Sequence, residues 1–412
     1  MSHTHVPAHA TPALPEHTQL PEHAQLLEAA HAAGLAALRS RNPGVDPARL
    51  PEAMRALGWV SLAAVGSLLV SSGALRTGGP PRSPGQIMDA LAVAPRHVWL
   101  VRRWLEVLAE DGVVVRSADG RRFGLSLTAP VADGEAEDAL EGTYAALGFP
   151  PVMPAFHRTA LGRLPELLRD EVTVQQLLFP DGDALTALAG YQTSAVGEYV
   201  NAAAGHAVRE AAERLRSRRV RIVELGGGAG VCTAAVLRAL RGVDANYLFT
   251  DVSRLFTVTA QQRYARELPG LRCALLDIDE DFARQGLPPG SADVVLAGNV
   301  LHNAVDARTS LRRIRELLAP GGRLVFTESV GENRAVLTSM AFLLSPEPGR
   351  PRVGSGDRRR ETGSAFLGAE EWDEELRAAG LTPLGSLPDP DSPLAAVGQH
   401  VFVADVPAEG AS

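Results

Sequence analysis

The chain has 412 residues, of which 45% are hydrophobic, and its formal net charge is −8 at neutral pH. This length predicts two domains, and the hydrophobic content is sufficient for packed cores and excludes global disorder. The acidic balance argues against nucleic acid or an anionic membrane as a partner, and the lack of any lysine excludes chemistry that needs a P-loop or Schiff-base lysine.

The N-terminal part predicts a tail followed by a mainly helical domain. Residues 1–25 lack the basic start and apolar core of a signal peptide, so they predict a disordered tail and a cytoplasmic protein. From residue 26 apolar residues recur at helical spacing, and two short apolar runs around Asp119-Gly120 predict a hairpin. Helices followed by a hairpin predict a winged helix over residues 26–128. We interpret it as a dimerisation and lid domain, so we expect a homodimer.

The sequence also predicts an apolar helix within this N-terminal domain and further helices in the middle of the chain. The apolar stretch from Leu57 to Leu75 is interrupted by glycine and serine, so we expect a buried interface helix and no membrane span. Residues 129–200 predict a helical connection, and a helix over about 194–216 leads into the second domain. A cluster of arginines follows this helix and is expected to form its solvated end: Arg214, Arg216, Arg218, Arg219 and Arg221.

Residues 201–406 alternate strands and helices, and residues 407–412 form a short tail. The alternation predicts an α/β, Rossmann-like fold with a mainly parallel seven-stranded sheet and an antiparallel last strand. The predicted strands are VRIVEL, NYLFTD, RCALLD, DVVLAGN, RLVFTE, LTPLGSL and HVFVADV, and the last two resemble a hairpin. Cys232 and Cys273 are expected to be free thiols, and no metal site is predicted.

A glycine-rich loop follows the first of these strands and reads Glu224-Leu-Gly226-Gly-Gly228-Ala-Gly230. Glycine suits positions where the backbone turns sharply or where a ligand comes too close for a Cβ. The dinucleotide fingerprint needs glycine at position 231, which is valine here. An acid beside the loop suits a cationic ligand better than a pyrophosphate. We therefore expect the loop to bind S-adenosylmethionine (SAM), whose amino-acid end carries an ammonium group, and S-adenosylhomocysteine (SAH) as product.

Polar residues also end the next three strands. Asp251 ends the second strand and is expected to bind the ribose hydroxyls of the cofactor. Asp277 ends the third and is expected to bind the adenine amino group, with Ile278 packing on the ring. Asn299 ends the fourth strand. Because the carboxyl ends of parallel strands meet at one edge of an open α/β sheet, these residues are predicted to line one cofactor site.

A histidine and a glutamate complete this edge. His302 follows the fourth strand and Glu328 ends the fifth. A carboxylate bonded to one imidazole nitrogen fixes the tautomer and raises the basicity of the other nitrogen. We therefore expect His302 to act as a general base that Glu328 orients.

The segment after Glu328 is expected to contribute to a lid over the pocket, with Met340, Phe342, Phe366 and the arginines at 358–360. These arginines could bind a carboxylate or the phosphate of a pantetheine arm, or they could belong to a solvated, mobile loop.

From Leu164 to Glu328 the sequence resembles the methyltransferase domains embedded in modular polyketide synthases. The shared features, in matching order, are LPELLRDEV, LLFPDGD, Tyr191 with Asn201, the glycine loop, FTDVS, LLDID, QGLPPGSADVVLAGNVLHNA and LLAPGGRLVFTE. This resemblance implies that Tyr191 belongs to the cofactor site. It also implies that His302 and Glu328 deprotonate the α-carbon of a β-keto thioester, carried on an acyl carrier protein or free.

The N-terminal half instead resembles that of winged-helix small-molecule O-methyltransferases, which share the GGG-x-G loop and an LHN-type histidine. The chain departs from them in having Ala304-Val305-Asp306 where their tryptophan and acid usually follow. Three functions are therefore open: C-methylation of a biosynthetic intermediate, O- or N-methylation of a finished small molecule, and binding without methyl transfer. One histidine can serve as base for a C–H or an O–H group, so it does not identify the acceptor.

Overall fold

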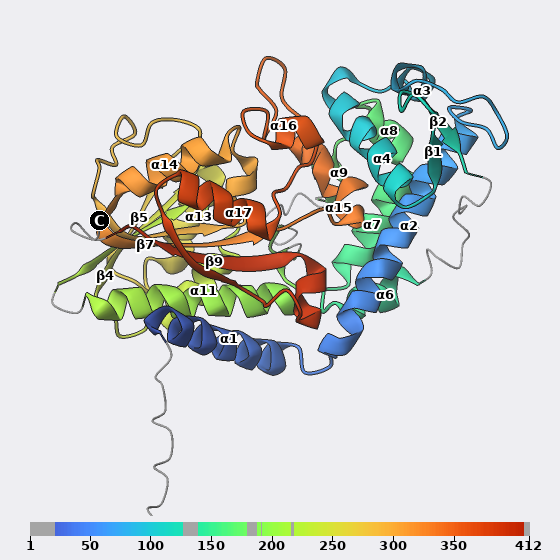
Figure 1. Cartoon of the computed structure of the whole chain (residues 1–412). Helices are drawn as coiled ribbons and strands as arrows, with labels where there is room; N and C mark the ends of the chain where they lie inside the picture. The colour runs from blue at the N-terminus through green and yellow to red at the C-terminus, as the bar shows by residue number, and fades with distance from the viewer. Residues whose placement is uncertain (1–20, 127–138, 179–187, 191, 216–217, 408–412) are drawn as a thin grey trace, which may run out of the picture.

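A computed structural model of the chain describes residues 21–126, 139–178, 188–190, 192–215 and 218–407 (Figure 1). Within these residues a seven-stranded sheet has the order β5-β4-β3-β6-β7-β9-β8. Its strands are β3 Val220–Leu225, β4 Ala245–Asp251, β5 Leu271–Leu275, β6 Ala292–Gly298, β7 Leu318–Ser329, β8 Thr382–Leu387 and β9 Gln399–Asp405. Strand β9 pairs antiparallel with β7 and β8, whereas β3 to β7 pair in parallel. The predicted sheet, with its antiparallel last strand, is confirmed.

Helices cover both faces of the central strands, and successive side chains of each strand point to opposite faces. Ile222 enters a core cluster with residues of α11, α12 and α13, and its neighbour Val223 enters a second cluster with residues of α14 and α17. The helices of the first face are α11 Ala195–Arg214, α12 Val231–Ala239 and α13 Arg254–Tyr264. Those of the second face are α14 Ala307–Leu317 and α17 Ala369–Ala378. This half of the molecule is called the sheet lobe below.

The helix α1, Glu22–Arg41, lies along α11 and also contacts β8 (Figure 1). Its Gly34 allows close approach, since a Cβ there would lie 2.5 Å from the ring of Tyr199. His31 contacts the hydroxyl of the same tyrosine at 2.7 Å. The predicted domain boundaries stay predictions, but α1 packs on the sheet lobe and not with the rest of residues 26–128.

The remaining N-terminal helices form a second, helical lobe (Figure 1). Its α-helices are α2 Leu50–Ser71, α3 Pro84–Leu91, α4 Val98–Glu110, α6 Leu140–Ala146, α7 Val152–Gly162, α8 Leu164–Leu168 and α9 Val174–Leu178. Strands β1 Val114–Arg116 and β2 Phe123–Leu125 form an antiparallel hairpin after α4. The order of helices and hairpin matches the prediction, whereas the winged-helix dimerisation role stays a prediction.

Short helical turns connect these parts. They are η1 Pro47–Arg49, η2 Pro95–His97, η3 Leu301–Asn303, α15 Arg334–Leu337, η4 Met340–Leu344, α16 Arg359–Thr362 and η5 Pro393–Val397. The segment from α15 to η4, although it follows β7, packs with the helical lobe: Trp104 of α4 donates its indole N–H to the carbonyl of Leu337 at 2.9 Å. The two lobes are therefore joined by contacts as well as by the chain.

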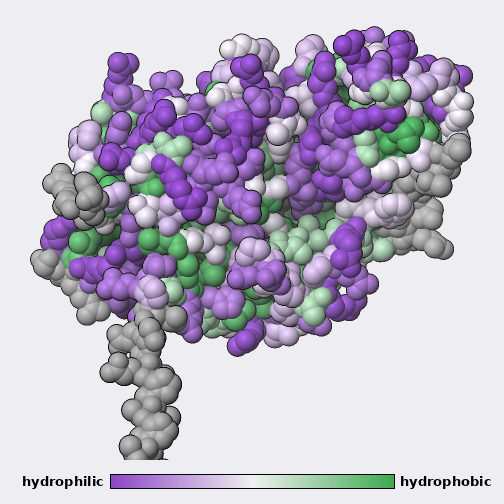
Figure 2. Space-filling model, viewed as in Figure 1, coloured by the Kyte–Doolittle hydropathy of each residue, from purple (hydrophilic) through white to green (hydrophobic). Residues whose placement is uncertain are grey.

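Helix α2 lies at this junction and contacts α6, α15 and η5. Among the described residues, the helix over Pro47–Ser71 is long and apolar enough to cross a membrane by those two criteria, and 61% of its apolar window is buried inside the protein. Hydrophilic residues cover most of the face shown in Figure 2, and hydrophobic residues show at the junction of the lobes. The position of α2 agrees with a buried helix at a domain interface.

Two arginines of the predicted solvated cluster also form ion pairs, although their side chains stay 46% and 37% exposed. Arg218 and Arg221 both bind the carboxylate of Asp293, each with a shortest distance of 2.6 Å. The Asp293 side chain is only 1% exposed, and these arginines hold its pKa well below its usual range against the opposing effect of burial. The reason is the sheet register, which places the start of β3 beside the start of β6.

Candidate active site

The glycine loop turns the chain from β3 into α12. Gly226, Gly228 and Gly230 all have positive φ, of 58°, 53° and 79°. A Cβ at Gly226 would lie 2.3 Å from Val300, and one at Gly230 would lie 2.6 Å from Tyr264. At Gly228 the nearest atom would be 4.0 Å away. Packing therefore demands glycine at positions 226 and 230, and the backbone at Gly228 leaves room for a ligand to approach.

Glu224 lies beneath this loop and not on its ligand side. Its side chain is fully buried, and its two oxygens accept hydrogen bonds from the hydroxyls of Thr233 at 2.9 Å and Tyr247 at 2.8 Å. Burial raises the pKa of Glu224 to about 7, although these hydrogen bonds oppose the rise. The acid therefore supports the loop from inside the sheet lobe, and direct contact with the cofactor stays a prediction that this position does not favour.

Asp251, at the end of β4, lies next to the open part of the loop. Its Oδ2 accepts from the backbone N–H of Gly228 at 3.0 Å, and its Oδ1 accepts from Ser253 at 2.8 Å. Burial raises its pKa. Each carboxylate oxygen has a second lone pair, so Asp251 can still accept from hydroxyl groups of a ligand. The sheet order places β4 directly beside β3, as the predicted ribose contact requires.

The next strand ends differ in accessibility. Asp277 is partly exposed, and its Oδ1 accepts from the backbone of Asp279 at 2.9 Å. Ile278 is 7% exposed and packs in the second core cluster. The adenine contacts of both residues stay predictions, as does the cofactor role of Tyr191, which lies outside the described residues.

Asn299 connects the ends of β6 and β7. Its φ of 55° is uncommon for a residue other than glycine, and such strain concentrates at functional sites. Its Oδ1 accepts from the backbone and from the hydroxyl of Ser329, at 3.1 and 3.2 Å. These bonds hold Asn299 at the carboxyl edge of the sheet, where it lines the cavity described below.

The predicted histidine–glutamate pair is present at this edge. Nδ1 of His302 lies 2.8 Å from Oε2 of Glu328, and the backbone N–H of His302 donates to Oε1 at 3.0 Å. Glu328 is fully buried and His302 is 8% exposed. Because an ionised carboxylate can only accept, this contact places the proton on Nδ1 and leaves the lone pair on Nε2. The His302 ring lies 5.1 Å from that of Phe366.

The sequence singled out Arg359 but did not indicate that it holds the histidine loop. Arg359 is 1% exposed and donates to the carbonyls of His302 at 2.6 Å and Ala304 at 2.9 Å. It also binds the buried carboxylate of Asp357 at 2.7 Å. The interpretation of this arginine as a phosphate ligand or as part of a solvated loop is wrong, because its buried guanidinium already binds backbone carbonyls and the carboxylate of Asp357. In the sequence, the signal for this ion pair was Asp357, two residues before Arg359.

Other members of the predicted lid also have different positions. Arg358 binds acids of α17, including Glu374 at 2.7 Å. Phe342 packs against the ring of His97 in the helical lobe, and Met340 is buried in the same core. Phe366 is the member of this group that lines the cavity, so it connects the cavity with the His302 ring.

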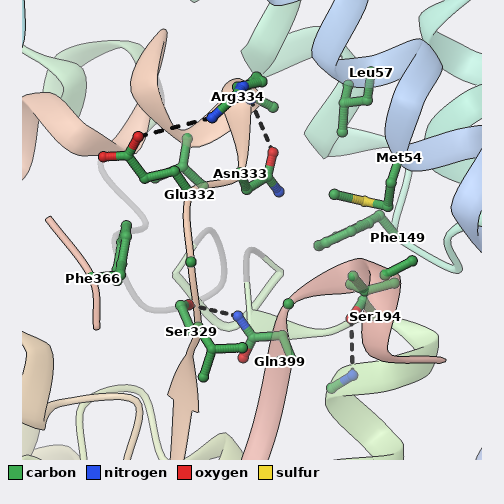
Figure 3. Close-up of a pocket in the computed structure, with 18 of the residues that line it drawn as sticks. Met54, Leu57, Phe149, Ser194, Ser329, Glu332, Asn333, Arg334, Phe366 and Gln399 are labelled. Carbon is green, nitrogen blue, oxygen red and sulfur yellow. Dashed lines mark hydrogen bonds and ion pairs between the residues drawn. The ribbon is translucent and has the colours of Figure 1, made fainter. Parts of the chain in front are cut away.

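A cavity of about 710 Å³ lies between the two lobes (Figure 3). Met54, Leu57 and Phe149 of the helical lobe face Ser329 and Gln399 of the sheet lobe across it. Gln399 donates to the hydroxyl of Ser329 at 2.6 Å, which fixes the polar side of the wall. An apolar cavity with a few fixed polar groups is typical of a small-molecule site, and here it lies at the carboxyl edge of β6 and β7.

The described residues fit SAM as a cofactor. The loop is open at Gly228, where a ligand can approach the backbone closely, and Asp251 offers carboxylate acceptors beside it. Acidic side chains at this edge suit ribose hydroxyls and a cationic ligand.

Comparisons with known proteins agree with this geometry. A family model described as a methyltransferase domain matches residues 223–324. The chain is 30% identical over 357 residues to pyochelin synthetase PchF of Pseudomonas aeruginosa, which is 85% of this chain and 19% of that protein. It is 31% identical over 304 residues to polyketide synthase ThaQ of Burkholderia thailandensis, or 71% of this chain and 14% of that protein. The chain thus spans less than a fifth of the length of these relatives.

Among solved structures, the CurJ carbon methyltransferase matches with a TM-score of 0.78 and 27% identity, covering 93% of this chain and 99% of that one. The fold and the site therefore define a SAM-dependent methyltransferase. Within this class the chain is related to the carbon methyltransferase domains of polyketide synthases.

Proposed function

We propose that this protein methylates the activated carbon between the two carbonyl groups of a β-keto thioester, which is attached to a carrier protein. The observation that carries the proposal is the buried Glu328–His302 pair, whose histidine ring lies against Phe366 of the cavity wall. The similarity to a protein described as a carbon methyltransferase supports the choice of carbon. The similarity to synthases and synthetases supports a carrier-bound acceptor.

The proton balance of the reaction assigns a role to each member of the pair. Bound SAM supplies an electrophilic methyl group and leaves as SAH. Nε2 of His302 takes the proton from the α-carbon, whose electron pair then forms the new C–CH₃ bond. Glu328 accepts the Nδ1–H bond at 2.8 Å, so it orients the ring and stabilises the imidazolium that forms. The proton passes to solvent after release of the product.

The rest of the site sets the position of the pair and provides an apolar wall. Arg359 bonds to the carbonyl of His302 and so holds the base in place. Met54, Leu57 and Phe149 offer an apolar wall to an acyl chain. In the same proposal, Gly228 and Asp251 hold the cofactor, while Asp277, Ile278 and Asn299 complete its site. The predicted homodimer and cytoplasmic location also remain part of the proposal.

The proposal is tested by the chemical shift of the transferred methyl group. The protein is incubated with SAM labelled with ¹³C in its methyl group and a 3-oxoacyl thioester, either on a carrier protein or on N-acetylcysteamine. We expect a new signal in the aliphatic C–CH₃ region. A signal in the methoxy or N-methyl region from an extract of the native host, with no product from the thioesters, would instead establish methylation of oxygen or nitrogen.

A further inference from the structure

Helix α2 supplies two adjacent rows of side chains to the cavity between the lobes. Met54 and Leu57 form the inner row, in which Leu57 is 2% exposed and Met54 is partly buried (Figure 3). Arg55 and Trp59 form the outer row, in which both residues are exposed, Trp59 by 52%. Residues three or four positions apart lie on one face of a helix. Because Arg55 and Trp59 line the cavity and also reach solvent, they lie at its rim.

Arg55 carries a positive charge that no neighbouring acid balances. Among the described residues that line the cavity, the cationic side chains are those of Arg55 and Arg334. Arg334 bonds to Asp111 at 3.1 Å and contacts Glu110 at 3.4 Å. Within the described ranges no acid pairs with Arg55, not even Glu52, which lies three positions earlier on the same helix. An exposed guanidinium without an acid is available to an anion, and its planar set of N–H groups matches a phosphate.

We propose that Arg55 binds the phosphate of the phosphopantetheine arm that carries the methyl acceptor, and that Trp59 packs against the arm beside it. This inference rests on the proposed function for the thioester. A thioester on this arm is apolar at its acyl end and anionic at its phosphate. Helix α2 offers an apolar inner row and a cationic rim in the same order. The acyl group therefore enters first, and Arg55 selects acceptors that carry the phosphate.

Three variants separate the charge at the rim from its surroundings. Arg55→Gln removes the charge at an exposed position, so it should leave the fold unchanged. Arg49→Gln is the matched control, because Arg49 is also exposed, lies directly before α2 and is outside the described cavity wall. Trp59→Ala removes the neighbouring aromatic surface and keeps the charge.

The experiment compares kcat/KM on a 3-oxoacyl phosphopantetheine thioester and on the 3-oxoacyl pantetheine thioester, which lacks the phosphate. We expect the wild type and Arg49→Gln to prefer the phosphorylated thioester about threefold to tenfold at low ionic strength. Added salt should reduce this preference, because the ion pair is exposed. Arg55→Gln should lose the preference, mainly through KM. Trp59→Ala should weaken the use of both thioesters by a similar factor and keep their ratio.

Equal preference ratios in the wild type and Arg55→Gln would overturn the inference. Loss of the preference in Arg49→Gln as well would also overturn it, since the net charge of the protein would then explain the effect. Turnover of the pantetheine thioester by the wild type tests the proposed function separately, because this thioester lacks the phosphate. If neither thioester is methylated, the proposed function fails. Calorimetric binding of phosphopantetheine and pantetheine to the SAH-loaded protein then still tests Arg55, and equal affinities would refute its role.

The same phosphate occurs on carrier proteins and in coenzyme A. Comparing kcat/KM on the 3-oxoacyl carrier protein and on 3-oxoacyl coenzyme A identifies which of the two delivers the arm.

Discussion

Two buried histidines, one in each lobe, show how the partner decides the role of the residue. His302 in the sheet lobe contacts a carboxylate and lies beside Phe366 of the cavity wall. Within the part of the chain that the structure describes, the hydrogen-bond partners of His157 in the helical lobe are hydroxyls, those of Tyr144 at 3.0 Å, Thr338 at 3.2 Å and Ser61 at 3.5 Å. Burial lowers the pKa of His157 to about 4. A carboxylate partner stabilises an imidazolium, whereas hydroxyl partners in a dry core leave the ring neutral.

The largest expected effect is on enzymatic activity, which should fall when His302 is replaced and persist when His157 is replaced. His302→Gln should lower kcat/KM about 10² to 10⁴-fold, since it removes the general base. SAH affinity, measured by calorimetry, should stay within a factor of about three, because the substitution leaves the glycine loop intact. The matched variant His157→Gln should retain most of the activity. Normal turnover by His302→Gln would contradict the assignment of the base.

The second prediction concerns the clamp that supports His302. Arg359→Met leaves the buried Asp357 carboxylate without its cation, so it should cost about 3 kcal/mol of unfolding free energy. Turnover should also fall because the His302 loop loses a hydrogen bond at its carbonyl. Chemical denaturation measures the first effect. The exposed neighbour Arg360 provides the control, and equal stabilities of Arg359→Met and Arg360→Met would exclude a clamp.

A smaller effect is expected for the carboxylate beneath the glycine loop. The raised pKa of Glu224, about 7, means that the folded state prefers the protonated acid. Its contribution to stability is therefore present below the unfolded pKa of about 4.5 and is lost as the pH rises through 7. Between pH 5 and pH 8, wild type should lose about 2 to 3 kcal/mol relative to Glu224→Gln. A pH-independent stability difference between the two proteins would show that Glu224 ionises normally.

The smallest effect has the opposite sign and belongs to the helical lobe. The lowered pKa of His157, about 4, means that the folded state prefers the neutral ring. Its contribution is present above the unfolded pKa of about 6.5 and is lost as the pH falls through 4. From pH 7 to pH 5, wild type should lose about 2 kcal/mol relative to His157→Gln. Denaturant titrations at both pH values measure this, and a gap that widens in favour of wild type at pH 5 would refute the neutral assignment.

The sheet and the edge where the site lies were predictable because their determinants are local. Each strand is a short apolar run, and parallel strands bring their carboxyl ends to one edge whatever the details of packing. His302 follows β6 and Glu328 lies at the end of the neighbouring β7, and the structure joins them at 2.8 Å. The run of glycines after β3 likewise predicts a loop that a ligand can approach, and the structure leaves room for a ligand at Gly228.

The sequence by itself thus determined the fold class, the glycine loop after β3 and the contact between His302 and Glu328. Only the tertiary structure decided that Glu224 points beneath the loop, that Arg359 binds the His302 carbonyl, and that Arg103 binds Glu332. The physical reason is that burial and hydrogen-bond pairing join residues far apart in the chain: Arg103 and Glu332 are 229 positions apart. Such pairing leaves no periodic pattern in the sequence, whereas strands and turns do.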